Sequence, residues 1–341
     1  MPPLVPSSPP ASFGALLRAA IAQRQNLINA GTTEAFRVFS GIADGLDGVY
    51  LDVYDCGAVM IVYEGRPPRS FDPRAEAETA WNILKPLAVE AVYLKPFAKD
   101  RSRLGGALPA CVTDPTPAAG GAQPEAIVIR EHDWKLEIRL YDGLSTGLFL
   151  DQRDNRHWVA QWSAQRARAA QPGPAVLNTF AYTCAFSVAA AVAGASTTSV
   201  DVSARYLDWG KRNFAHNGLD PAEHHFAKMD TFDFFGYAAR KALRYDLIIL
   251  DPPSFAAGKK KVRPWSSVAD YARLVGQASR LLKPRGVIFA STNTQELCRP
   301  GRLEHEIVKG LGRTPKWIEL PETPVDFARE EDRFAARAFG I

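Results

Sequence analysis

Hydrophobic and polar positions divide the chain into two regions of different texture. Up to about residue 150, segments of alternating apolar and polar residues predict two hairpins, over 48–63 and 126–140. From about residue 155, helical stretches alternate with short apolar strands, which we place at 175–179, 198–202, 224–228, 246–250 and 286–291. That order is typical of a doubly wound α/β sheet.

This division predicts three segments. Residues 1–35 form a lead-in and a linker helix, residues 36–145 form a smaller α+β domain with hairpins, and residues 146–341 form the doubly wound α/β domain. A chain of 341 residues with 46% hydrophobic residues can build a core in each domain.

Composition narrows the classes of function. The 41 basic and 37 acidic residues give a net charge of +4, which permits a polyanionic partner without requiring one. The 4 cysteines form no C-x-x-C pair, so neither a zinc site nor a disulfide framework is indicated, and a reducing cytosol fits them best. The longest apolar run, near residues 180–195, is too short and too mixed to span a membrane. We therefore expect a cytoplasmic protein with no metal and no membrane contact.

Polar residues follow the predicted strands at the edge of the sheet where doubly wound folds bind ligands. Asp201 lies about where such folds place the carboxylate that accepts the ribose hydroxyls of a cofactor. The first strand-to-helix turn, after Thr179, lacks the G-x-G-x-x-G pattern that a dinucleotide requires. These features favour S-adenosylmethionine, whose adenine would meet Asp230 and Met229, although each acid alone could instead cap a helix.

The strand at 247–250 runs into a turn with the sequence DPPSF, residues 251–255. Prolines cannot continue a β-ladder, so this turn leaves the sheet over the ligand-binding edge. Asp251 and the proline carbonyls could accept hydrogen bonds from a flipped base, and Phe255 could stack on that base or anchor the loop. The run KKKVR, residues 259–263, would either track RNA phosphates or remain a solvated loop.

Five motifs match those of one known family: TGLFLDQRDNR (146–156), NTFAYTCAF (178–186), VDVS (200–203), NFAHNG (213–218) and LDPPSF (250–255). Together they resemble the bacterial 23S rRNA methyltransferases, class I enzymes that use S-adenosylmethionine to make 5-methylcytosine or 7-methylguanine. The resemblance implies a seven-stranded Rossmann-like domain and large-subunit rRNA as the partner, and a homodimer is left open. It also implies that the N-terminal PUA domain of the 5-methylcytosine members is absent.

The resemblance and the strand ends together assign candidate residues. Candidates for cofactor binding are Gln152, Arg153, Asn178, Thr179, Phe180, Ala181, Tyr182, Thr183, Asp201, Val202, Ser203, Asn217, Met229, Asp230 and Asp251. Catalytic candidates are Asp251, Pro252 and Pro253, and candidates for substrate binding are Phe255, Lys259, Lys260 and Asn293. In the family, the segment with Gln152 and Arg153 lies against the methionine end of the cofactor, where an arginine can fork to the carboxylate. The alternative for these arginines is a salt bridge at a domain junction.

One departure from the family bears on the reaction. The 5-methylcytosine members carry a cysteine after the strand that reads VIFASTNT here (287–294), and Thr292 stands at its position. C5 of cytosine is not nucleophilic until a thiolate has added at C6. We therefore predict direct methyl transfer to a base nitrogen such as guanine N7. Asn293 also resembles the 7-methylguanine members of the family at this position. The alternatives are C5 methylation through Cys298, methylation of a protein or small molecule, and an RNA-binding assembly factor without turnover.

Overall fold

The computed structural model describes residues 11–98, 109–169, 172–256, 265–327 and 334–341. Contacts divide the chain into two compact units, which we call the N-terminal unit (Met1–Ile129 and Ile138–Thr146) and the C-terminal unit (Arg130–Glu137 and Gly147–Ile341). The predicted boundary after residue 145 put the segment 130–137 with the N-terminal domain. In the structure this segment instead groups with the C-terminal unit, because its strand is bonded to a helix there.

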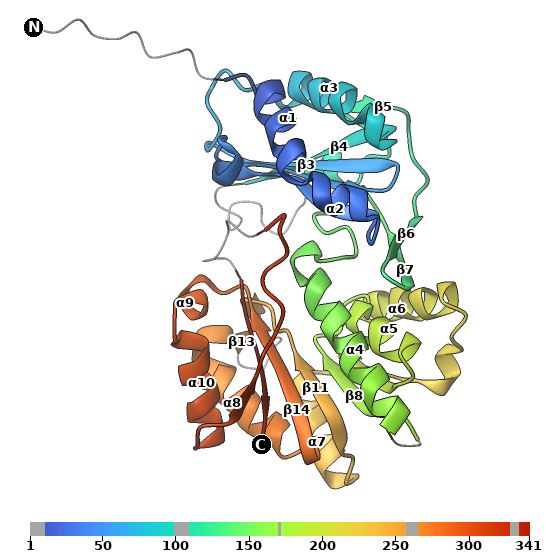
Figure 1. The fold of residues 1–341 in the computed structure, drawn as a ribbon, viewed down its shortest axis with the longest axis vertical. Coiled ribbons are helices and arrows are strands. Elements are labelled where there is room, and N and C mark those ends of the chain that lie inside the picture. Colours follow the sequence, from blue (N-terminus) through green and yellow to red (C-terminus); the bar gives the residue numbers. More distant parts are fainter. Residues whose placement is uncertain (1–10, 99–108, 170–171, 257–264, 328–333) are drawn as a thin grey trace, which may run out of the picture. The chain divides into compact units, whose positions relative to one another are not determined.

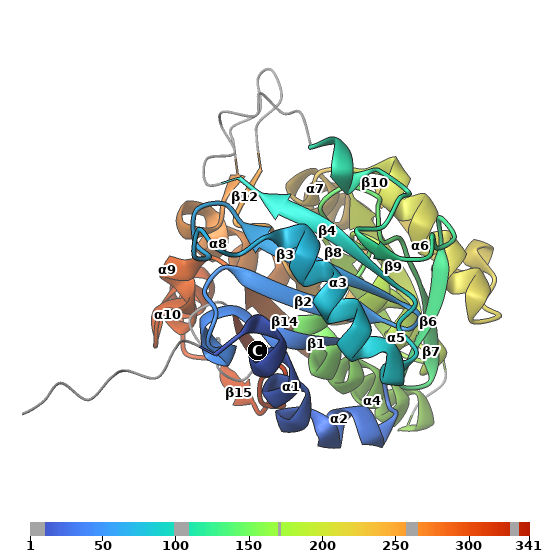
Figure 2. The same cartoon turned by 90° about the horizontal axis from the view of Figure 1, so that it is seen from above.

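The N-terminal unit is a five-stranded sheet covered by helices. Its strands follow the order β1 (Ala35–Ser40), β2 (Val49–Tyr54), β3 (Gly57–Tyr63), β4 (Ala91–Phe97) and β5 (Ala119–Gly120), with β3 and β4 parallel and the other pairs antiparallel. The helices are α1 (Phe13–Gln23), α2 (Gln25–Ala30) and α3 (Pro73–Leu84), with short 3₁₀ turns η1 (Gly41–Asp44), η2 (Lys85–Leu87) and η4 (Ala110–Val112). Figure 2 shows α3 lying over the strands.

Burial of apolar faces explains this arrangement. Leu17 of α1 and Leu84 of α3 pack on Leu51 and Met60 of the sheet, all with no exposed surface. Each such side chain contributes roughly 1.5–3 kcal/mol of burial free energy. The hairpin predicted over 48–63 is confirmed as β2 and β3, whereas the single linker helix predicted within residues 1–35 is interrupted at Arg24.

The C-terminal unit confirms the predicted doubly wound sheet. Its seven strands follow the order β10-β9-β8-β11-β14-β16-β15, and all neighbouring pairs are parallel except those that involve β16. The strands are β8 (Ala175–Thr179), β9 (Ser196–Asp201), β10 (His225–Lys228), β11 (Tyr245–Leu250), β14 (Leu282–Thr292), β15 (Lys316–Ile318) and β16 (Ala335–Gly340). Two antiparallel pairs stand outside this sheet, β6 (Ile127–Glu131) with β7 (Trp134–Ile138) and β12 (Phe255–Ala256) with β13 (Trp265–Ser266).

Helices cover both faces of this sheet. They are α4 (Arg153–Ala169), α5 (Ala185–Val192), α6 (Ala204–His216), α7 (Thr231–Arg240), α8 (Ser267–Ser279), α9 (Gln295–Cys298) and α10 (Arg302–Leu311), with 3₁₀ turns η5 (Leu150–Gln152) and η6 (Pro221–Glu223). Leu247 and Ile249 pack in the core cluster with α4 and α5, while Ile248 and Leu250 pack in the cluster with α7, α8 and α10. Figure 1 shows α4 and α5 on one side of β11 and α8 and α10 on the other.

The strand β11 therefore carries a continuous aliphatic run because both of its faces are buried. Within the described ranges, no helix is both long and apolar enough to cross a membrane.

Candidate cofactor and substrate site

A cavity of about 720 Å³ opens at the carboxyl ends of the C-terminal sheet. It is lined from β8, β9 and β10 on one side and from the segments after β11 and β14 on the other. The chain order reverses between β8 and β11, which makes this the topological switch point where doubly wound sheets bind ligands. The volume suits a nucleoside-sized ligand.

The loop after β8 adopts an unusual backbone on the wall of this cavity. Phe180, Tyr182 and Cys184 have φ values of 54°, 49° and 62°, the left-handed region that non-glycine residues rarely occupy. Such residues cost of order 1 kcal/mol each and persist only where the surroundings hold them. Here the hydroxyl of Thr183 donates to the carbonyl of Gly147 at 2.6 Å, and the amide of Tyr182 donates to Asp201 at 2.9 Å. The loop is thus fixed without the glycines that would have marked it in the sequence.

Asp201 joins the ends of β8 and β9. Its Oδ2 accepts the amide of Tyr182 at 2.9 Å, and its Oδ1 accepts the amide of Ser203 at 2.8 Å. Burial raises the pKa of this carboxyl, and the backbone hydrogen bonds oppose that rise. Asp201 lines the cavity, so its carboxylate can accept hydroxyl groups of a ligand bound there.

Asp230 lies at the end of β10 and begins α7. Its Oδ1 accepts the amides of Phe232 at 2.8 Å and Asp233 at 3.4 Å, so the alternative of a helix N-cap is correct for this residue. The residue also lines the cavity, together with Met229. A capping role and a place in the site are therefore compatible.

Asp251 lies at the centre of a bonded group beside the cavity. Its Oδ1 accepts the hydroxyl of Ser291 at 2.6 Å and the amide of Gln152 at 3.2 Å. Gln152 is itself held, because its Oε1 accepts the amide of Asn155 at 3.0 Å. Burial raises the pKa of Asp251, while the hydrogen bond from Ser291 lowers it. Ser291 of β14 and Gln152 of η5 thus position the carboxylate that follows β11.

The proline turn after Asp251 is tied down on its outer side. The carbonyl oxygen of Pro253 accepts the indole of Trp265 at 2.8 Å and the hydroxyl of Ser267 at 2.9 Å. Both of its lone pairs are used, so the predicted role of this carbonyl as an acceptor for a base does not fit the structure. Pro252 lines the cavity, and so does Asn293, whose Oδ1 accepts the hydroxyl of Ser254 at 2.7 Å.

Arg153 is a correction to the predicted cofactor set. Its guanidinium is buried and forms a bidentate pair with Asp326, at 2.7 and 3.1 Å. It is not among the described residues that line the cavity. The competing interpretation, a structural salt bridge, describes it better. Thr179 also stays outside the cavity, since its hydroxyl donates to the carbonyl of Ile249 at 2.8 Å within the sheet.

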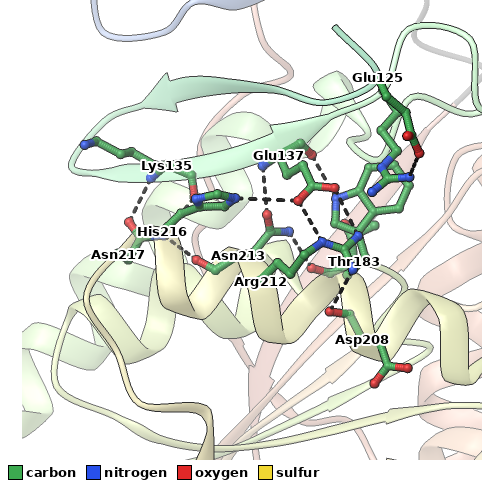
Figure 3. A network of polar contacts seen from close by, with 11 residues as sticks. Glu125, Lys135, Glu137, Thr183, Asp208, Arg212, Asn213, His216 and Asn217 are labelled. Atoms are coloured by element: carbon green, nitrogen blue, oxygen red, sulfur yellow. Dashed lines mark hydrogen bonds and ion pairs between the residues drawn. The ribbon is translucent and has the colours of Figure 1, made fainter.

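Asn217 is a second correction, and it reveals a contact that we call the hairpin clamp. Asn217 accepts the amide of Lys135 and donates to the carbonyl of the same residue, both at 2.8 Å, as a neighbouring strand would. Asn213 accepts the amide of Glu137 at 2.8 Å and donates to the carbonyl of Thr183 at 2.9 Å. Figure 3 shows these side chains reaching from α6 to the hairpin strand β7. The asparagines of the motif NFAHNG therefore pair with the exposed backbone groups of strand β7 and do not contact the cavity.

Charged groups complete the clamp. Arg212 forms a bidentate pair with Glu137 at 2.8 and 3.0 Å, and the indole of Trp209 donates to the carbonyl of Glu137 at 3.1 Å. Because Asn213 also holds Thr183, the same helix supports both the hairpin and the cofactor loop (Figure 3).

The other candidates divide into two groups. The cavity is lined by Gln152, Asn178, Phe180, Ala181, Tyr182, Thr183, Asp201, Val202, Ser203, Met229, Asp230, Asp251, Pro252, Pro253 and Asn293. The side chain of Phe255, and Lys259 and Lys260 altogether, lie outside the described residues. Sequence reasoning missed Phe149, which lies within the motif at 146–156 and was assigned no role there. It also missed Tyr206, Phe232, Asp270 and Arg273, which line the cavity from α6, α7 and α8 and belong to no motif.

The cysteines stay away from the cavity. Cys184 is fully buried, and burial raises its pKa to about 12, so it packs inside the fold as a thiol. Cys298 is buried and its thiol donates to the carbonyl of Thr292 at 3.5 Å. In the described part of the chain, no cysteine lines the cavity and no three His, Cys, Asp or Glu side chains gather as a metal site.

The strand order and the cavity at the switch point define a Rossmann-like fold of the class I methyltransferase type. Residues 118–335 match the family of S-adenosylmethionine-dependent methyltransferases. The chain belongs to this family, and its cofactor is S-adenosylmethionine.

Similar proteins agree with this assignment. The chain is 40% identical over 285 residues to YwbD of Bacillus subtilis, a candidate ribosomal RNA large subunit methyltransferase, with 83% of this chain and 67% of that protein covered. It is 34% identical over 248 residues to ribosomal RNA large subunit methyltransferase K of Neisseria meningitidis serogroup B, covering 72% of this chain and 63% of that protein. The chain thus spans about two thirds of the length of each.

Two solved structures share the fold over nearly the whole chain. One is a candidate methyltransferase complexed with SAH, with a TM-score of 0.81 and 32% identity, covering 96% of this chain and 81% of that one. The other is a candidate SAM-dependent methyltransferase from Streptococcus mutans, with a TM-score of 0.81 and 30% identity, covering 99% of this chain and 84% of that one.

Proposed function

We propose that this enzyme transfers a methyl group from S-adenosylmethionine to a base of large-subunit ribosomal RNA. The acceptor in this proposal is a ring or exocyclic nitrogen such as guanine N7, with no covalent intermediate between enzyme and base. The names of the relatives in Bacillus subtilis and Neisseria meningitidis support the choice of RNA. The environment of Thr292 supports the choice of a nitrogen.

The observation that carries the nitrogen acceptor is the position of Thr292. Its side chain is fully buried, and its hydroxyl accepts the amide of Thr294 at 3.1 Å. It therefore presents no nucleophile to the cavity where the 5-methylcytosine enzymes need a thiolate. Cys298 does not replace it, because its thiol is buried against the carbonyl of Thr292. A nitrogen lone pair can attack the sulfonium methyl directly and needs no such thiol.

The carboxylates suggest how the cofactor lies. In our proposal Asp201 accepts the ribose hydroxyls, and Asp230 and Met229 meet the adenine. Gln152 and the loop from Tyr182 to Thr183 then surround the methionine end. This placement brings the sulfonium cation towards Asp251, whose carboxylate favours positive charge nearby.

The protein's part in the reaction is then mainly positioning. Asp251 and Pro252 hold the base in line with the methyl group, and Asn293 fixes the far side of the turn through Ser254. Holding reactants near the attack geometry can contribute roughly 7–11 kcal/mol to lowering a barrier. Phe255, Lys259 and Lys260 remain predicted substrate contacts, and a homodimer remains a prediction for sedimentation analysis.

The test is nucleoside mass spectrometry of ribosomal RNA from cells with and without the gene. We expect one methylated base nitrogen, such as 7-methylguanosine, to disappear on deletion and return with the wild-type gene. The variant Asp201→Ala, which removes the ribose acceptor, should not restore it, whereas Asp220→Ala outside the cavity should. Loss of 5-methylcytidine would contradict the nitrogen acceptor, and label transfer from the purified enzyme that survives ribonuclease would contradict RNA as substrate.

A further inference from the structure

The described residues that line the cavity carry an uneven set of charges. Its acidic lining residues are Asp151, Asp201, Asp230, Asp233, Asp251 and Asp270. In the described part of the chain, its lining cations are Arg156 and Arg273. Arg156 is buried and bound to Glu131 at 2.6 and 2.7 Å and to the carbonyl of Phe149 at 2.7 Å, so its charge is already neutralised. Arg273 is exposed and has no ion pair with any described residue.

This imbalance suits one ligand and opposes the other. The cofactor is a cation at its sulfonium, and an acidic cavity attracts it. An RNA strand carries a negative charge at each phosphate, and the same carboxylates repel it. A nucleotide that places its base in the cavity therefore needs a cation where its phosphate passes the rim.

Arg273 has the geometry for that task. Its guanidinium lies 4.1 Å from the ring centroid of Phe232, and that ring is 5.8 Å from the ring of Trp265, which is 5.8 Å from Phe180. A guanidinium over an aromatic face is held in place by cation–π attraction while its N–H donors remain available to an anion. The aromatic row thus positions a cation at the cavity.

We propose that Arg273 binds the phosphodiester of the nucleotide whose base enters the cavity. This inference rests on the proposed function, because it takes RNA as the substrate. The guanidinium forks to two phosphate oxygens, the aromatic row of Phe232 and Trp265 borders the sugar and base, and the carboxylates are left to the cofactor.

The carboxylate of the cofactor is the competing anion. It belongs to the methionine end, which we place at Gln152 and Tyr182. Arg273 instead stacks on Phe232, two residues beyond Asp230 at the adenine end. Arg273 therefore lies at the opposite end of the cofactor from the cofactor's carboxylate. Measuring SAH affinity and RNA affinity separately distinguishes that carboxylate from the RNA phosphodiester.

The test compares Arg273→Gln with Arg280→Gln. Both variants remove one exposed arginine from the region of α8, but Arg280 lies at the end of the helix and does not line the cavity. The probe is unmodified 23S rRNA transcribed in vitro, with tritiated S-adenosylmethionine as donor. We expect Arg273→Gln to raise the KM for RNA about tenfold at 0.1 M salt, as for loss of a charge-assisted contact. In Arg273→Gln, the slope of the logarithm of RNA affinity against the logarithm of salt concentration should be smaller in magnitude by about 0.7 than in the wild-type enzyme.

Further readouts separate phosphate binding from other roles. The dissociation constant for SAH should change less than twofold in Arg273→Gln, the melting temperature should match that of Arg280→Gln, and Arg273→Lys should recover part of the affinity. An equal effect of both glutamine variants would overturn the proposal, as would a tenfold loss of SAH affinity, which would place Arg273 on the cofactor. If the wild-type enzyme transfers no label to any RNA, the proposed function fails first, and that result is distinct from an active enzyme indifferent to Arg273.

Discussion

The hydroxyl of Ser291 donates to the carboxylate of Asp251 at 2.6 Å, across the ends of the parallel strands β14 and β11. Gln152 donates to both residues at 3.2 Å, which closes a triangle of polar groups. Burial raises the pKa of Asp251 and the Ser291 hydroxyl counteracts that rise, so this one hydrogen bond helps keep the carboxylate ionised in a desolvated place.

Replacing Ser291 by Ala should therefore raise the pKa of Asp251 further. If the ionised carboxylate is the active form, the acidic limb of the kcat/KM profile moves to higher pH, and the rate at neutral pH falls about fivefold for the loss of one hydrogen bond. The check is a pH series of methyl transfer, with Ser279→Ala, whose hydroxyl bonds within α8, as the control. An acidic limb that stays in place would show that Asp251 does not govern the profile.

Cys298→Ala should leave methyl transfer unchanged within about twofold. The thiol is buried and donates to the carbonyl of Thr292, and it does not line the cavity, so it has no path to a base. Removing it costs about 1 kcal/mol of stability through the small void that remains. Initial rates and thermal melting measure the two effects, and an inactive but folded Cys298→Ala enzyme would point to C5 chemistry after all.

Lys95 makes the stability of the N-terminal unit depend on pH. It is buried, its ammonium contacts the carbonyls of Leu144 and Ser145 at 3.4 and 3.3 Å, and desolvation lowers its pKa from 10.5 to about 7. Below about pH 7 both folded and unfolded chains hold the proton, and the folded state bears the full cost of a buried charge. Between about 7 and 10.5 only the unfolded chain holds it, so this contribution to stability improves as the pH rises.

We therefore expect Lys95→Met to stabilise the protein at pH 6.5 by about 2 kcal/mol, after allowance for the lost contacts. The gain should shrink steadily towards pH 10. Urea unfolding at several pH values checks this, with the exposed Lys316→Met as the control. A gain that is independent of pH would mean that Lys95 does not titrate in this range.

The hairpin clamp should be visible in hydrogen exchange. Asn217→Ala removes the acceptor of the Lys135 amide, and Asn213→Ala leaves the amide of Glu137 and the carbonyl of Thr183 unpaired. We expect faster exchange at Lys135 and Glu137, respectively. The stability loss should be about 1–3 kcal/mol for the buried Asn213 and less for Asn217. Asn82→Ala, on an exposed face of α3, provides the control, and unchanged exchange at both amides would contradict the clamp.

The sequence alone determined the sheet and the edge that carries the site. Four consecutive aliphatic residues, Leu247 to Leu250, can be satisfied only by burial on both faces, and polar residues directly after such a strand fall at one sheet edge. Strand β8 has the bounds that were predicted, because its pattern and end signals are local. Asp201, Asp230 and Asp251 line the cavity for the same reason.

The tertiary structure decided which polar group pairs with which. The motif around Arg153 predicted that it binds the cofactor. In the structure it is instead paired with Asp326, a carboxylate 173 residues away in the sequence. Arg273 belongs to no motif and enters the cavity only because α8 packs beside α7 and its Phe232. A charged group that is removed from water has to pair with a group buried beside it. Which group lies beside it is decided by long-range packing, and no local sequence pattern encodes that packing.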